Sequence, residues 1–143
     1  MIFALLLLAT TPSNFDTAKA SSTILGLQAQ LSARLKGPDA HTVETKEFAN
    51  KLTKMSFLGW SLCVTKKSEE FATLNEPLGD LADAAMGACS DFEYKMLASV
   101  QLAGEADELN ISVEQAKEFL ESHKKALRQE ALGKVASTKS GSK

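Results

Sequence analysis

The sequence predicts an all-α fold, a small antiparallel bundle of about four helices with one disulfide in a helical hairpin. Strong helix formers dominate the chain, and it lacks both a period-2 run of Val, Ile and Thr and an Asn-Gly or Asp-Gly hairpin signal. Its only two cysteines, Cys63 and Cys89, lie symmetrically about the turn signal Asn75-Glu76-Pro77. Two helices that reverse direction at this turn would lie side by side, which predicts a Cys63–Cys89 disulfide. The alternative is two reduced cysteines that fill small core positions.

The start of the chain predicts an exported protein. The apolar run from Ile2 to Ala9 contains 8 residues, too few to span a bilayer, which needs about 20. A polar stretch follows and ends in Ala18-Lys19-Ala20, where the small residues suit cleavage by a signal peptidase after Ala20. No Lys or Arg precedes the apolar run, and the stretch between Ala9 and Ala20 is long for a cleavage region. The alternative is a buried N-terminal strand or helix of a cytosolic protein.

These observations divide the chain into a signal peptide (1–20), one helical bundle domain (21–136) and a disordered polar tail (137–143). The remaining domain is large enough to form a single hydrophobic core. The tail, STKSGSK, has no apolar side chain to anchor it, so we expect it to be disordered. A signal peptide and a disulfide together predict a periplasmic or secreted protein.

The first two helices are predicted from apolar spacing and from stop signals. The first is expected over residues 22–36, because Gly37-Pro38 provides a cap conformation and then a residue that cannot continue the helix. The second is expected over residues 42–73, with Gly59 allowing a neighbouring helix to approach closely. The apolar face of the first helix contains Ile24, Leu27, Leu31 and Leu35.

The last two helices are predicted from their start signals. The third is expected from Glu76-Pro77 to about Gly104, because proline is tolerated in the first turn. Small residues between positions 82 and 88 would let another helix approach, as a disulfide at Cys89 requires. The fourth is expected to begin at the capping box Ser112–Gln115, with Ile111 placed to pack against its first turn.

The composition and the motifs indicate neither an enzyme nor a nucleic-acid-binding protein. A net charge of -2 with one Trp and one Tyr provides neither a basic surface nor stacking platforms for bases. His41 and His123 have no partners at metal-ligand spacing, and the serines lack the G-x-S-x-G context. Cys63 could act as a thiol nucleophile only if no disulfide consumed it. We therefore expect no enzymatic activity, no metal or other cofactor, and no membrane span once the signal peptide is removed.

One pattern of residues covers the middle of the chain: Trp60-Ser61-Leu62-Cys63, then Pro77, then Leu81-Ala82-Asp83-Ala84-Ala85, then Ala88-Cys89. The pattern resembles small exported proteobacterial helical proteins of unknown function. In those proteins an aromatic-x-x-Cys helix precedes a Pro-started helix with an A-D-A-A-x-x-A-C type segment. The resemblance implies a periplasmic or secreted helical protein, and it brings no activity and no functional residues.

The leading functional hypothesis is a non-enzymatic exported protein that binds an unidentified protein partner. Trp60 is its candidate partner contact, because aromatic side chains contribute disproportionately to interface energy, and the alternative is that Trp60 packs in the bundle. A second hypothesis is a carrier of small apolar ligands, and a third is a membrane-tethered protein with an uncleaved N-terminus. The carrier would need a cavity lined by Met55, Phe57, Leu58, Met86, Phe92 and Met96, and the alternative is that these residues form a filled core.

Overall fold

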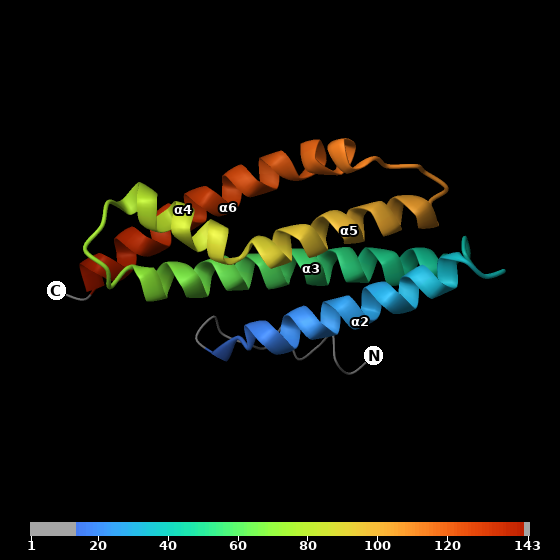
Figure 1. Cartoon of the computed structure of the whole chain (residues 1–143), viewed down its shortest axis with the longest axis horizontal. Helices are drawn as coiled ribbons and strands as arrows, with labels where there is room; N and C mark the ends of the chain where they lie inside the picture. The colour runs from blue at the N-terminus through green and yellow to red at the C-terminus, as the bar shows by residue number, and fades with distance from the viewer. Residues whose placement is uncertain (1–13, 142–143) are drawn as a thin grey trace.

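Five α-helices form an antiparallel bundle in the computed structural model, which describes residues 14–141 (Figure 1). Helix α3 is central and contacts each of the other four helices. Helices α4 and α5 lie end to end alongside α3 (Figure 1). The predicted all-α antiparallel bundle is confirmed. The helices are α2 (Thr17–Leu35), α3 (Val43–Phe71), α4 (Leu78–Ala88), α5 (Ser90–Ala106) and α6 (Val113–Gly141).

The bundle encloses one main hydrophobic core to which all five helices contribute. A smaller cluster of Ala72, Leu81 and Val135 closes the end where α3, α4 and α6 meet. Burial of aromatic and aliphatic side chains of this size is the main source of stability in a small domain. The largest fully buried side chains of the main core are Trp60, Phe15, Phe92, Ile24, Leu31, Leu52, Leu127 and Val64.

A short polar network crosses the main core between α2, α3 and α5. Gln28 Nε2 donates hydrogen bonds to the Lys95 carbonyl at 2.7 Å and to Ser99 Oγ at 3.0 Å. Ser99 Oγ in turn lies 2.7 Å from Ser56 Oγ, which donates to the Leu52 carbonyl at 2.9 Å. Each buried polar side chain in this network therefore has a partner, which offsets the cost of removing it from water.

The predicted third helix is divided in two, so the expectation of one helix up to Gly104 was wrong at Cys89. This residue lies between α4 and α5 with φ -105° and ψ 16°, and its N–H donates to the Met86 carbonyl at 3.2 Å. Gly87 lowers the helix propensity just before the break. Asp91 lies in the first turn of α5, where a negative charge favours a new helix N-terminus.

Helix α2 begins at Thr17 rather than at residue 22. Asp16 caps it by accepting a hydrogen bond from the Lys19 N–H at 3.0 Å. Phe15 precedes the cap and belongs to the main core. The predicted signal-peptide boundary after Ala20 therefore falls inside a helix, whereas residues 1–13 of that predicted peptide lie outside the described residues.

Helix α6 continues to Gly141, through most of the segment that the sequence predicts to be a disordered tail. Val135 is buried against Ala72 and Leu81, which fixes the helix two residues before this segment. Lys139 Nζ then donates a hydrogen bond to the Leu74 carbonyl at 2.6 Å. Residues 137–141 are thus helical because their neighbours anchor them, and residues 142–143 lie outside the described range.

Candidate functional site

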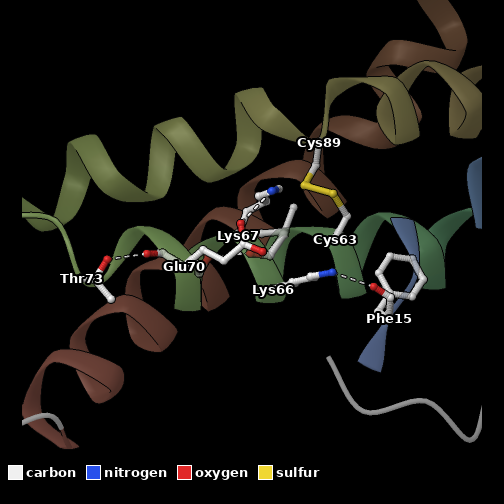
Figure 2. Close-up of polar contacts among 9 residues, drawn as sticks. Phe15, Cys63, Lys66, Lys67, Glu70, Thr73 and Cys89 are labelled. Carbon is white, nitrogen blue, oxygen red and sulfur yellow. Dashed lines mark hydrogen bonds and ion pairs between the residues drawn. A yellow bond between two sulfur atoms is a disulfide. The ribbon is translucent and has the colours of Figure 1, made fainter. Parts of the chain in front are cut away.

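The predicted disulfide between Cys63 and Cys89 is present, with the two Cα atoms 5.9 Å apart (Figure 2). It ties the centre of α3 to the break between α4 and α5, and each cysteine is 1% exposed. Both sulfur atoms are bonded, so the alternative of two reduced cysteines and the hypothesis of a Cys63 nucleophile are both excluded in this structure. The disulfide therefore has a structural role here.

Trp60 is buried and does not lie at the surface. The prediction that it contacts a partner was therefore wrong. The side chain is 0% exposed and belongs to the main core. The adjacent residue is also in a close contact: a Cβ on Gly59 would lie 2.9 Å from the Phe92 ring, so only glycine lets α5 approach α3 this closely. The alternative stated for Trp60, packing within the bundle, is what the structure shows.

Four of the six residues expected to line an apolar cavity are buried in the bundle. Met86, Phe92 and Met96 belong to the main core, and Met55 is also buried. Phe57 lies nearer the surface, where its ring forms an edge contact with His123 at 5.3 Å between centroids. Four of the six residues are therefore core residues, and none of the six lines the cleft described next.

A cleft of about 610 Å³ lies at the end of the bundle where α2 ends and α5 leads into α6. Four of its lining side chains are aliphatic: Leu35, Leu102, Leu109 and Ile111. Its volume lies within the range of about 300–1,000 Å³ that is typical of small-molecule pockets. This cleft was not predicted from the sequence, because its residues come from separate segments that only the fold brings together.

The C-terminal end of α5 forms one wall of the cleft through a closed helix cap. Glu108 adopts a left-handed conformation with φ 61°, and the Leu109 N–H donates to the Gly104 carbonyl at 2.7 Å. The Glu108 N–H donates to the Glu105 carbonyl at 3.0 Å, which completes a Schellman motif. The chain therefore reverses direction in a fixed geometry, with Leu109 directly after the turn.

The loop after this turn is held against α5. A Cβ on Gly104 would lie 2.5 Å from Ile111 Cδ1, so the isoleucine occupies the space that only glycine leaves open. Gln101 Nε2 donates to the Ile111 carbonyl at 3.2 Å. The predicted capping box follows, with the Gln115 N–H donating to Ser112 Oγ at 3.1 Å and the Ser112 N–H donating to Gln115 Oε1 at 2.9 Å. The loop that lines the cleft is thus anchored at both ends.

The connection between α2 and α3 also lines the cleft. His41 lines the cleft, and its Nδ1 lies 3.2 Å from the Ala106 carbonyl, to which it donates when it carries the proton. Thr45 Oγ1 donates to the Asp39 carbonyl at 2.8 Å, which holds the connection in place. His41 therefore joins the α2–α3 connection to the C-terminal end of α5. The second histidine, His123, lies far along α6 and packs between aromatic rings.

The cleft carries uncompensated negative charge. Glu105 and Glu108 line it, both are exposed, and no Lys or Arg is among the lining residues. The ion pairs formed among the described residues involve other acidic side chains. A cationic group that enters the cleft would therefore meet two carboxylates beside an aliphatic surface.

Within residues 14–141, no group of three or more His, Cys, Asp and Glu side chains is placed to hold a metal ion. None of the described helices is both long and apolar enough to cross a membrane. Comparisons with protein-family models, with curated proteins and with solved structures found no match to this chain. The resemblance to small exported proteobacterial proteins therefore stays a prediction.

Proposed function

We propose that this protein is an exported, non-enzymatic binding protein, and that its end cleft receives a segment of a partner protein. The segment would present a Lys or Arg side chain next to an aliphatic one. One observation carries the proposal: the cleft combines four aliphatic side chains with Glu105 and Glu108 and has no cationic lining residue. The buried disulfide supports an oxidising compartment outside the cytoplasm, because disulfides persist mainly there.

A protein segment explains the surroundings of the cleft better than a small ligand does. Leu109 lines the cleft yet is 58% exposed. Leu109 is thus a large apolar side chain that stays in water at the edge of a cleft, which is typical of protein interaction sites. A partner segment that continues over the rim would cover this side chain more fully than a small ligand within the cleft.

The conformation of Glu108 gives further support. A residue with a Cβ in the left-handed region costs roughly 1–2 kcal/mol, whereas glycine adopts it freely. The turn itself would be more stable with glycine at this position. A glutamate that bears this cost at the edge of the cleft is consistent with a role for its carboxylate in binding.

The test uses a photo-crosslinking amino acid at Leu109 in the full-length protein, produced in its own host. Leu25 is the matched control, because it is 59% exposed on α2 and does not line the cleft. We expect one protein to be crosslinked at position 109 and not at position 25. Equal crosslinking at both positions would contradict the proposal.

Two variants of the crosslinking protein separate binding from folding. Glu108→Gly should raise the free energy of unfolding by about 1 kcal/mol, because it relieves the left-handed glutamate, yet it should lower the crosslink yield. Glu105→Lys should lower the yield further, because it reverses a charge of the cleft. Unchanged yields in both variants would refute a cationic partner segment. A small molecule retained by the purified protein and lost in Glu105→Lys would favour the carrier hypothesis instead.

A further inference from the structure

The segment from Phe15 to Ala20 belongs to the folded bundle and contributes Phe15 and Ala20 to its core, although the sequence predicts that the segment is removed with the signal peptide. The Phe15 side chain is 2% exposed, and its ring centroid lies 6.0 Å from that of Phe92. Lys66 Nζ donates a hydrogen bond to the Phe15 carbonyl at 2.9 Å, beside the disulfide (Figure 2). Ala20 is also buried in the main core. These contacts join the start of α2 to the centre of the bundle.

Cleavage after Ala20 would remove both the core residue and the helix cap. Asp16 accepts the Lys19 N–H through its side chain, and its carbonyl accepts the Ala20 N–H at 3.0 Å. A chain beginning at Ser21 would lack these bonds and would leave a space next to Phe92. Cavities left by a deleted phenylalanine are among the most destabilising core changes.

The sequence offers an earlier cleavage site that spares the core. If the peptidase cuts after Ser13, the last residue removed is Ser13 and the third-last is Thr11, and both are small, as the enzyme requires. This cut also shortens the stretch after the apolar run, which is unusually long if cleavage follows Ala20. We infer that the signal peptidase cuts after Ser13, so that the exported protein begins at Asn14 and keeps Phe15 in its core. The inference rests on the export that the proposed function includes.

The first experiment expresses the full chain in a host with a periplasm and measures the intact mass of the protein in each compartment. We expect extracytoplasmic protein that begins at Asn14. Extracytoplasmic protein that begins at Ser21 would overturn the inference and leave the export proposal intact. A chain that stays uncleaved in the cytoplasm would overturn both.

Two substitutions in the full chain test the position of the cut directly. Ser13→Gln places a large residue at the last position before the proposed cut, so the species beginning at Asn14 should be lost and precursor should accumulate. Ala18→Gln is the matched control, because Ala18 is exposed and is the third-last residue before the alternative cut. It should leave processing unchanged. The reverse result, a block by Ala18→Gln alone, would contradict the inference.

A third variant, Phe15→Ala, reports whether this residue persists in the exported protein. If the chain begins at Asn14, the midpoint of thermal unfolding should fall by about 10–20 °C, because a buried phenylalanine is lost. If the chain begins at Ser21, the midpoint stays the same, and the inference fails. Leu25→Ala on the exposed face of the same helix should leave the midpoint unchanged in either case.

Discussion

Replacing Gly104 by alanine should destabilise the protein although it exchanges a helical glycine for the best helix former. The added Cβ would lie 2.5 Å from Ile111 Cδ1, 2.8 Å from its Cγ1 and 3.4 Å from its Cβ. Ile111 cannot withdraw freely, because Gln101 holds its carbonyl and the capping box follows directly. Overpacking of this kind costs about 1–3 kcal/mol, and the gain in helix propensity offsets up to about 1 kcal/mol. We expect a net loss of about 1–2 kcal/mol in the free energy of unfolding.

The sign of this effect should reverse when Ile111 is shortened. An Ile111→Ala background removes the two closest contacts, and the nearest one left, to the Ile111 Cβ position at 3.4 Å, is an ordinary distance. Gly104→Ala should then stabilise the protein by about 0.5–1 kcal/mol through helix propensity alone. Urea unfolding of the oxidised protein measures both values, provided that the slope with denaturant stays constant.

A second glycine serves as the control. Gly133 lies inside α6, and a Cβ there would meet no atom within 4 Å. Gly133→Ala should therefore stabilise the protein by about 0.5–1 kcal/mol. If Gly104→Ala stabilises the protein as much as Gly133→Ala does while Ile111 is intact, the close packing of Ile111 on α5 is refuted.

Three further changes test the core and the charged surface. Replacing both Cys63 and Cys89 by alanine opens a loop with a sequence separation of 26 residues, and urea unfolding should show a loss of about 3.5 kcal/mol with helical circular dichroism retained. Ser99→Ala removes hydrogen bonds to two buried side chains that each keep one other partner, so urea unfolding should show a loss of about 1–2 kcal/mol. A hydrogen bond from Lys95 lowers the pKa of Asp91 below its ordinary value of 3.8. The charged carboxylate therefore stabilises the folded state above pH 3.8, and this stabilisation is lost as the pH falls through the lower pKa of the folded protein. Asp91→Asn should thus cost less than about 1 kcal/mol at pH 7, and its difference from the unchanged protein should vanish at the acidic end of a pH series.

The fold could be predicted because its signals are local and agree with one another. Helix formers, apolar spacing and the Ser112–Gln115 capping box each act within a few residues. The symmetry of Cys63 and Cys89 about a turn added the one long-range restraint, and it was correct. The break at Cys89 was missed because apolar spacing continues across it, and only the backbone of that residue leaves the helical conformation.

The candidate site could not be predicted from the sequence in the same way. Its walls come from the connection at His41 and the turn at Glu108, and their proximity depends on how α2, α3 and α5 pack. Gly104 and Ile111 carried the only local signal, a glycine in the last turn of a helix followed by an apolar residue before a cap. Trp60 was the wrong candidate, because a large aromatic side chain suits an interface and a core equally well, and only the fold shows that it is buried.

The burial of Trp60 has an optical consequence. It is the single tryptophan of the chain, it is fully enclosed, and its indole N–H makes no hydrogen bond with the described residues. Its fluorescence in the native protein should therefore peak at short wavelength and shift to the red when water reaches the ring. Cys63 lies one helical turn away on α3, so Trp60 fluorescence reports on the surroundings of the disulfide as well as on the opening of the bundle.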